Sequence, residues 1–496
     1  MAKNDLYDRL KLVEKAMISC LPEADLYLHV GYETAHNVGR WVEAALLLEN
    51  KVGMVIPPKI EKAMLLYFRA LTSNPYGMLY NDREVLGGGS LNHHNLRECL
   101  LSLAALIQYR NSRWAVHCGE RLVDALDRRF FTGTLTEEEM CETLGLPING
   151  DPMITRPEDD PYREEDYTSS HGRAIEGLLA FWKLTGSAKA KEVMEKAVDF
   201  HRIHTIRMDG STPEWMLSDI HVGHNHSYLG TVRGLLRYGL EFGDAALVEA
   251  VYRTYVNSIL RHNCSPSGWA PHDLGKLRFP DGLGDPYGDH ASCADIAYIA
   301  FLLATRGGHP ELLDETERFI RARLFRCQVQ AGTEQGAWGT YGGYFGAGVV
   351  MDVFALIAGT LAIIYRDSVE EKEGSLWVHL HFSQECEPAQ VTAYRDTHQH
   401  LNIVPTRAQT VRVRIPGWCD VSTLRVTGPE GQGIPYTLED SYAVIPVEAV
   451  EAGRALAVSF PLPMTETVEY TTVSHTGYRL RWKGDEIIQV DELSKE

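Results

Sequence analysis

Residues 171–187, HGRAIEGLLAFWKLTGS, carry the pattern on which the predicted fold depends. The apolar side chains of this stretch recur at helical spacing and make one face: Ile175, Leu178, Leu179, Phe181 and Trp182. A short Thr-Gly-Ser loop follows at 185–187, and a second helix is expected to start near residue 187. This unit, two helices joined by a short loop, indicates a fold built from helical hairpins.

The same arrangement recurs over most of the chain, as a repeat of pattern rather than of letters. First helices are expected near residues 36, 94, 171, 225, 291 and 346, and second helices near 58, 112, 187, 244 and 311, with a sixth partner unassigned. Long loops rich in proline, glycine, aromatic and acidic residues precede the first helices. Helix pairs that bury one face against their neighbours stack into solenoids or close into rings, so six pairs predict an (α/α)6 barrel.

The sequence changes character near residue 368. Short runs with alternating apolar residues follow, as expected for half-buried strands, at residues 377–382, 411–415 and 455–460. The polar stretch 367–374 is the predicted linker. We therefore expect a mainly α protein with a β domain: an (α/α)6 barrel over residues 1–368 and a C-terminal β-sandwich over residues 369–496.

The composition excludes several classes of partner. The chain has 48 Lys and Arg against 67 Asp and Glu, a formal net charge of −19, which disfavours binding to nucleic acid or to an anionic membrane surface. Asp352 and Gly359 interrupt the longest apolar run, so a buried helix is expected there rather than a membrane span. The start of the chain has no apolar segment of a signal peptide, which predicts a cytoplasmic protein.

The nine cysteines are scattered and form no CxxC motif. This spacing argues against a disulfide framework and against a structural zinc knuckle. We expect no cofactor. The oligomeric state stays open, and a homo-oligomer is compatible with these features.

Histidines lie at or just before five of the six expected first helices. They are His36, His93, His94, His171, His224, His226 and His290. In a ring of helix pairs, the starts of the inner helices share one end, where their unpaired N–H groups point into the centre. A single histidine at such a place more commonly packs against or caps its own helix than takes part in catalysis. The set of histidines together predicts a shared pocket, since imidazoles both donate to and accept from sugar hydroxyls.

Three long loops add aromatic and acidic residues. They are PEWMLSDIH at 213–221, GWAPHDLG at 268–275 with DPYGDH at 285–290, and AWGTYGGYF at 337–345. Tryptophan and tyrosine offer flat faces to sugar rings, and paired carboxylates supply the acid and base of glycosidic cleavage. Asp273 is the predicted proton-transfer group, while helix capping or turn formation stays open for Asp219, Asp285 and Asp289.

Several of these stretches, in this order, resemble the β-L-arabinofuranosidases of glycoside hydrolase family 127. The resemblance rests on EGLLAFWKLTG at 176–186, HNH at 224–226, SCAD at 292–295, VHLHF at 378–382 and VRIPGW at 413–418. It implies a helical barrel with a β-sandwich that acts on sugars. It also implies a pocket histidine at His224 and an acid/base group near Asp273 or His272, and it places Arg173 where that family usually has a histidine.

The chain departs from that family at the zinc site. The family pattern is a Glu, a Cys two residues later and an adjacent pair of cysteines, one of which is the nucleophile. Here Ala291 stands in the Glu position, only Cys293 matches, and residues 341–344 contain no cysteine. One thiolate cannot hold Zn²⁺ in a tetrahedral protein site. We therefore expect neither zinc nor a cysteine nucleophile, and a packed core thiol at Cys293.

The sequence predicts a glycoside hydrolase that cleaves an oligosaccharide by carboxylate and histidine acid–base chemistry, with Asp273, His224 and Asp289 as catalytic residues. The residues expected to hold the sugar are His36, His94, His171, Arg173, Glu214, Trp215, Asp219, His226, Trp269, His272, His290, Tyr341 and Tyr344. The alternatives are a lyase that uses Arg173 to neutralise a uronate, a sugar isomerase or epimerase, and a non-catalytic sugar-binding protein. The C-terminal domain is expected to be a structural support.

Overall fold

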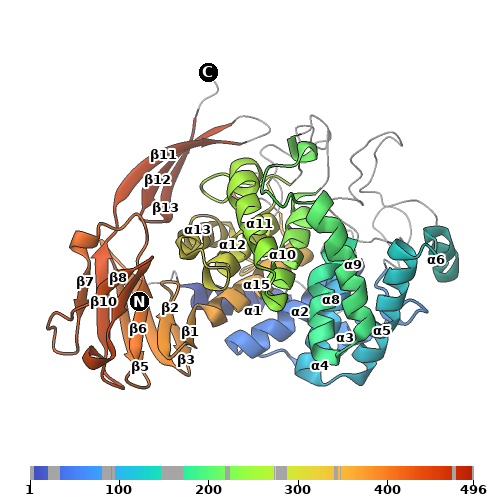
Figure 1. Cartoon of the computed structure of the whole chain (residues 1–496), viewed down its shortest axis with the longest axis horizontal. Coiled ribbons are helices and arrows are strands. Elements are labelled where there is room, and N and C mark those ends of the chain that lie inside the picture. Colours follow the sequence, from blue (N-terminus) through green and yellow to red (C-terminus); the bar gives the residue numbers. More distant parts are fainter. Residues whose placement is uncertain are drawn as a thin grey trace.

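The computed structural model describes residues 5–19, 34–80, 91, 95–146, 171–217, 224–272, 274, 288–339, 344–346, 348–471 and 476–493. Helices fill the part of the chain up to residue 367 and strands the part after it (Figure 1). The α-helices are α1 (Leu6–Ser19), α2 (Thr34–Val52), α3 (Pro58–Thr72), α4 (Asn95–Arg110), α5 (Arg113–Leu126), α6 (Glu137–Leu144), α8 (His171–Thr185), α9 (Ala188–His204), α10 (Asn225–Phe242), α11 (Ala245–Thr254), α12 (His290–Thr305), α13 (Leu313–Phe319), α14 (Phe325–Cys327) and α15 (Met351–Asp367).

The first helices of the expected pairs form a closed order in space. Helix α2 packs against α4, α4 against α8, α8 against α10, α10 against α12 and α12 against α15, and α15 returns to α2. These helices begin at residues 34, 95, 171, 225, 290 and 351, which confirms the predicted starts to within five residues. No helix within the described part of the chain has the length and hydropathy of a membrane span.

The sixth outer helix, which the hairpin pattern leaves unassigned, is α1. It packs against α15 and α2, so the first helix of the chain meets the last. Its buried face is formed by Leu6, Leu10, Val13 and Met17. The repeat pattern misses this pairing because the two partners lie at opposite ends of the helical part rather than next to each other in the sequence.

Glycines allow neighbouring inner helices to approach closely. A Cβ atom on Gly177 of α8 would lie 2.4 Å from the Cβ of Leu100 on α4, and one on Gly234 of α10 would lie 2.8 Å from the Cβ of Ile175 on α8. Such distances are far below van der Waals contact, so only glycine fits where these backbones meet.

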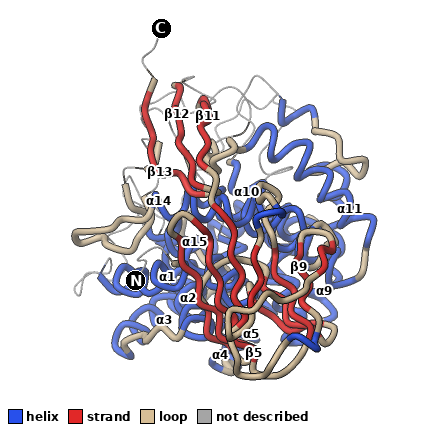
Figure 2. Tube along the Cα trace, turned by 90° about the vertical axis from the view of Figure 1, so that its left-hand side faces the viewer, coloured by secondary structure: helices blue, strands red, loops and turns tan. Residues whose placement is uncertain are grey.

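Two five-stranded sheets follow the helices and share one apolar core. The first contains, in order, β1 (Val369–Lys372), β2 (Ser375–Val378), β6 (Thr410–Arg414), β9 (Tyr442–Ile445) and β8 (Thr437–Glu439), with β2 and β6 parallel. The second contains β3 (Gln384–Cys386), β4 (Ala389–Arg395), β5 (His398–Pro405), β10 (Leu456–Pro461) and β7 (Arg425–Thr427). Figure 2 shows the strands lying over one side of the helices.

The expected linker at 367–374 is wrong. Helix α15 continues to Asp367, and β1 starts at Val369 and pairs with β2. The polar residues that suggested a linker belong instead to a surface strand. Glu370 on this strand accepts hydrogen bonds from the Arg306 guanidinium at 2.5 and 2.6 Å, which connects the first sheet to the end of α12.

A third sheet packs on the helical part. It consists of β11 (Met464–Tyr470), β12 (Gly477–Lys483) and β13 (Glu486–Glu492), and it lies above the other two sheets in the view of Figure 2. Tyr478 and Trp482 share a buried cluster with Trp269 and Tyr344 of the helical part. Glu469 on β11 accepts a hydrogen bond from the Ser267 hydroxyl at 2.5 Å, which anchors this sheet to the segment before Trp269.

Candidate active site

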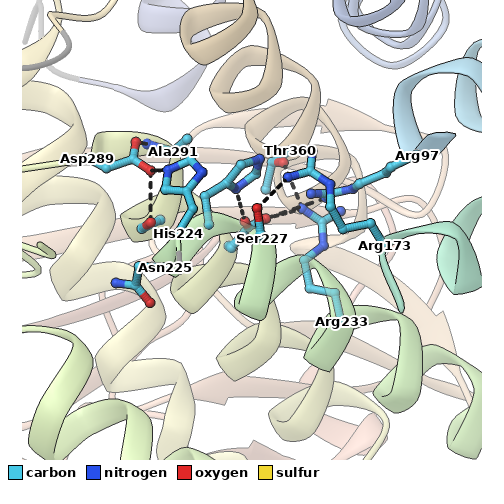
Figure 3. A network of polar contacts seen from close by, with 12 residues as sticks. Arg97, Arg173, His224, Asn225, Ser227, Arg233, Asp289, Ala291 and Thr360 are labelled. Atoms are coloured by element: carbon cyan, nitrogen blue, oxygen red, sulfur yellow. Dashed lines mark hydrogen bonds and ion pairs between the residues drawn. The ribbon is translucent and has the colours of Figure 1, made fainter. Parts of the chain in front are cut away.

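Charged side chains from five inner helices meet in the interior of the helical part, and Figure 3 shows three of them, Arg97, Arg173 and Arg233. They are Arg40 (α2), Arg97 and Glu98 (α4), Arg173 and Glu176 (α8), Arg233 (α10) and Asp295 (α12), each at most 3% exposed. Buried charges of this kind are tolerated only when they pair and hydrogen-bond with one another. We call these seven residues the buried charge network.

Two acids of the network, Glu176 and Glu98, are held ionised by the arginines. Glu176 accepts from Arg233 at 2.9 Å and from Arg97 at 3.3 Å. Burial alone would raise the pKa of Glu176, but the charges of these arginines lower that pKa to about 2. Burial likewise opposes ionisation of Glu98, and its ion pairs with Arg40 and Arg173 bring the pKa of Glu98 well below its ordinary value.

The His226 side chain hydrogen-bonds to two members of the buried charge network, and its ring is neutral. Its Nδ1–H donates to Asp295 at 2.5 Å, and its Nε2 accepts from Arg40 at 2.9 Å. Burial, together with the positive charge of Arg40 and Arg173, lowers the pKa of His226 well below its ordinary value. Because both ring nitrogens are used within the protein, the structure does not support the sugar-binding role predicted for His226.

Arg173 departs from its predicted role in the same way. It is fully buried, and its guanidinium donates to Glu98 and to the Ser227 hydroxyl, each at 2.9 Å. Its charge is therefore committed to the protein interior rather than offered to a uronate carboxylate.

A second group of side chains, at the starts of the inner helices above the network, is partly exposed to solvent. The side chains of His36, His224 and Asp352 are 9%, 12% and 22% exposed. His36 donates from Nδ1 to Asn95 at 3.2 Å, and its Nε2 lies 3.5 Å from a carboxylate oxygen of Asp352. In the neutral ring Nε2 is an acceptor, so it matches a protonated Asp352 carboxyl.

His224 and Asp289 form a dyad. The Nε2–H of His224 donates to Oδ2 of Asp289 at 3.2 Å, which leaves Nδ1 as the basic nitrogen of the neutral ring. Asp289 also caps α12 by accepting from the Ala291 N–H at 2.8 Å, and it accepts from the Ser292 hydroxyl at 2.9 Å. Burial would raise the pKa of Asp289, but the hydrogen bond from His224, and the positive charge that this ring carries when it is protonated, lower that pKa far below the ordinary value. The His272 ring stacks on the His224 ring with centroids 4.1 Å apart.

Asp352 behaves in the opposite way. It lies in the first turn of α15, and burial raises the pKa of its carboxyl to about 6. The positive charge of Arg40 opposes this rise without cancelling it, and the negative charge of Asp289 adds a smaller contribution to it. The sequence analysis missed Asp352 as a functional residue. The available signal was a single acid in the first turn of an otherwise apolar first helix, where an isolated carboxyl is costly to bury.

Two of the predicted histidines pack into the protein instead. His171 lies among Phe130, Phe131 and Phe200 and contacts His201 at 2.9 Å, and burial lowers its pKa to about 4. His290 donates from Nδ1 to the Gly339 carbonyl at 2.7 Å and contacts Cys327 Sγ at 3.1 Å from Nε2, with its pKa also lowered to about 4 by burial. For both histidines, the structure agrees with the alternative that the ring packs inside the protein rather than binding a sugar.

The predicted aromatic platforms are also packed. Trp215 on η2 (Glu214–Leu217) is buried against Tyr228, and its indole N–H donates to the His204 carbonyl at 3.3 Å, whereas Glu214 is exposed. Trp269 is buried in the cluster beneath the third sheet. In that cluster Tyr344 stacks on Tyr478 with centroids 4.0 Å apart. His94, Asp219, Asp273 and Tyr341 lie outside the described residues.

The residues present do not fit the zinc site of the resembled family. Ala291 offers only a methyl group. Cys293 is fully buried, and burial raises the pKa of its thiol well above the ordinary value, so it is a thiol rather than a thiolate ligand, as expected for a core cysteine.

No protein-family model and no curated protein matches this chain. Solved structures do. A GH127 β-L-arabinofuranosidase from Geobacillus stearothermophilus T6 superposes with a TM-score of 0.62 at 15% identity, over 96% of this chain and 80% of that one. A second GH127 β-arabinofuranosidase gives a TM-score of 0.62 at 16% identity, over 97% of this chain and 78% of that one. A sugar epimerase from a ruminal bacterium gives 0.53 at 11% identity, over 73% of this chain and 98% of that one. The chain therefore has a fold like that of the GH127 β-L-arabinofuranosidases, at a distance in sequence that establishes the fold alone.

Proposed function

We propose that this chain is a cytoplasmic glycosidase that cleaves a glycosidic bond in an oligosaccharide. In this proposal the closed order of inner helices is an (α/α)6 barrel that ends at residue 368, and the two sheets that share a core are a β-sandwich. The active site consists of the partly exposed His36, His224 and Asp352, near the starts of the inner helices, and of the buried His272, whose ring stacks on that of His224.

One observation carries the proposal: two acids at the same end of the helices are held in opposite protonation states. The Asp352 carboxyl, with its pKa raised to about 6, keeps its proton in mildly acidic solution. Asp289 stays ionised and holds His224 in one tautomer. A proton donor beside a group able to accept a proton is what hydrolysis of a glycosidic bond requires.

The roles follow from this contrast. Asp352 gives its proton to the glycosidic oxygen as the C–O bond breaks, and His224, oriented by Asp289, takes a proton from the water that attacks the anomeric carbon. Two sugars with free hydroxyls result. Asp352 is left deprotonated and His224 protonated, and both groups return to their starting states by proton exchange with solvent. Because water attacks directly, this mechanism inverts the anomeric configuration. His36 and His272 bind hydroxyl groups of the sugar.

Asp273, the proton donor that the sequence predicts, remains the alternative to Asp352. In the sequence it directly follows His272, the residue whose ring stacks on that of His224. The two assignments differ in which substitution removes acid catalysis, so they can be separated experimentally.

The test is a screen of nitrophenyl glycosides and of plant and bacterial oligosaccharides against the wild type and against Asp352→Asn, Asp273→Asn and Asp289→Asn. The matched control is Asp244→Asn, which alters another aspartate helix cap, at the start of α11. Loss of the acid should lower kcat/KM by about 10²–10⁴ on an oligosaccharide, and by much less on a nitrophenyl glycoside, whose leaving group needs no proton. The acid is whichever residue shows this dependence on the leaving group.

A protein that cleaves none of these substrates, or variants that all cleave them at the wild-type rate, would refute the proposal. A lyase receives less support, because Arg173 is paired with Glu98 instead of facing a substrate acid.

The stacked imidazoles favour a second candidate, a sugar epimerase. The ring centroids of His224 and His272 lie 4.1 Å apart, so in an epimerase this pair would act from one side, with one imidazole removing the proton from the sugar carbon, and a group across the sugar would return a proton on the other face. An epimerase would leave the chain length of an oligosaccharide unchanged and would incorporate deuterium from D₂O into the sugar, whereas a hydrolase does neither.

A further inference from the structure

Two histidines project from the same face of β5. Along this strand His398, His400 and Asn402 are half-buried, while Gln399 and Leu401 are buried. Successive side chains of a strand point to opposite faces, so residues two apart stand side by side. The rings of His398 and His400 have centroids 5.9 Å apart.

The turn between β4 and β5 places a carboxylate beside these rings. Oδ1 of Asp396 accepts from the backbone N–H of His398 at 2.7 Å and lies 3.1 Å from Nε2 of His400. One donor atom from each of Asp396, His398 and His400 lies within 4.8 Å of the other two. Within the described part of the chain, this is the one group of three such residues with its donors gathered so closely.

We propose that Asp396, His398 and His400 bind a divalent transition-metal ion of the zinc class. Two imidazole nitrogens and one carboxylate oxygen suit zinc, nickel or copper, whereas magnesium and calcium prefer oxygen ligands alone. Metal–ligand bonds of about 2.0–2.1 Å in a tetrahedron place neighbouring donors about 3.3 Å apart. The 3.1 Å between Asp396 and His400 already matches this spacing, and water takes the fourth position at this surface site.

Neighbouring residues orient the two rings. Nδ1 of His398 contacts the Thr397 hydroxyl at 3.0 Å, and a hydroxyl that accepts there leaves Nε2 for the metal. The Tyr394 ring stacks on the His400 ring with centroids 4.3 Å apart and planes 8° apart, which fixes the direction of that imidazole. Such outer contacts are typical of metal sites in proteins. The site belongs to a sheet rather than to the helices that carry the proposed active site, so it is independent of the glycosidase proposal (Figure 1).

The test titrates Zn²⁺ into the full-length, untagged chain after metal removal with a chelator, followed by calorimetry. We expect one ion per chain. The double variant His398→Ala/His400→Ala should bind at least roughly 100-fold more weakly. His117→Ala is the matched control, since His117 is an exposed histidine with one carboxylate neighbour, Glu120 at 3.3 Å, and no second imidazole in that pair. It should bind as the wild type does.

A second measurement does not depend on the variants. Cu²⁺ bound to the wild-type chain should give an electron paramagnetic resonance spectrum with splitting from two nitrogen ligands. The proposal is overturned by a wild type that binds no Zn²⁺ stoichiometrically, by a double variant of unchanged affinity, or by a Cu²⁺ spectrum with fewer than two nitrogens.

Discussion

His224 donates a hydrogen bond to Asp289 across 3.2 Å, although the two residues are 65 positions apart in the sequence. The contact joins the residue before α10 to the residue before α12, and it sets which nitrogen of His224 is basic. Asp289 has its oxygens occupied by three donors, so we assign it the role of orienting His224 rather than that of a nucleophile. This revises the direct catalytic role that the sequence suggested for Asp289.

The first prediction concerns this dyad. Asp289→Asn keeps an oxygen to cap α12 but removes the negative charge that fixes the His224 tautomer. We expect kcat/KM to fall by about 10²–10⁴ with the fold retained, as measured by initial rates and circular dichroism. Asp244→Asn changes the cap of α11 in the same way and should leave the rate unchanged. Equal losses in the two variants would mean that capping alone explains the effect.

The second prediction concerns the pH dependence of activity. Because Asp352 acts as an acid only when protonated, and its pKa is raised to about 6, kcat/KM should fall as the pH rises above about 6. Asp352→Asn should remove this alkaline limb from the profile of whatever activity remains on a nitrophenyl glycoside. A limb that survives in the variant would belong to another group, with Asp273 the first to test.

The third prediction is that Asp352→Asn stabilises the folded protein at neutral pH. The folded-state pKa of Asp352 lies above the ordinary 3.8, so the folded protein holds the proton more tightly and ionisation destabilises it. Below pH 4 both states are protonated and the effect is absent. It grows between pH 4 and 6 and is complete above pH 6.

The size of this effect is at most about 3 kcal/mol, from a shift of about two pKa units. Urea unfolding of wild type and variant at pH 4 and pH 7 measures it, and the pH 4 pair serves as the control. A variant that is less active and yet more stable marks a residue kept for function rather than for folding. A variant destabilised equally at both pH values would contradict the raised pKa.

The sequence predicts the elements well because each depends on local signals. The apolar spacing of 171–187 and the turn residues that follow it act within one hairpin, and the observed helices α8 (His171–Thr185) and α9 (Ala188–His204) match it. The partner of α15 depends on a contact between the two ends of the helical part, which no local pattern encodes.

The site is only partly predictable, for a related reason. The start of a helix can be read from sequence, but the direction of its first side chain depends on helix phase and on neighbours. His36 and His224 stay partly exposed above the buried charge network, whereas His171 turns into a cluster of phenylalanines. The raised pKa of Asp352 is likewise a product of burial by distant segments, so in the sequence this residue is only an interruption of an apolar run.

The fourth prediction concerns the buried charge network. Arg233→Met removes the partner of both Glu176 and Asp295 and leaves two carboxylates buried with less compensation. We expect the free energy of unfolding to fall by about 3–5 kcal/mol. The control is Arg253→Met, which breaks an exposed i,i+4 pair with Glu249 and should cost less than about 1 kcal/mol. Equal costs would show that the network contributes no more than a surface pair.

The last prediction tests the packing that sets the inner helices side by side. Gly177→Ala would put a methyl group 2.4 Å from the Cβ of Leu100. If α8 and α4 move apart to make room for it, they also move two charged residues: Glu176, which precedes Gly177 on α8, and Glu98, two residues before Leu100 on α4. We expect a loss of about 1–3 kcal/mol in urea unfolding. Because Glu98 and Glu176 are anchored in the network beneath His36 and Asp352, the same variant should also lower kcat/KM. Gly433→Ala, where an added Cβ meets nothing within 4 Å, should change neither quantity. A stable, fully active Gly177→Ala would show that the helices can separate without disturbing the layer above them, and the active site would then have to be supported from elsewhere.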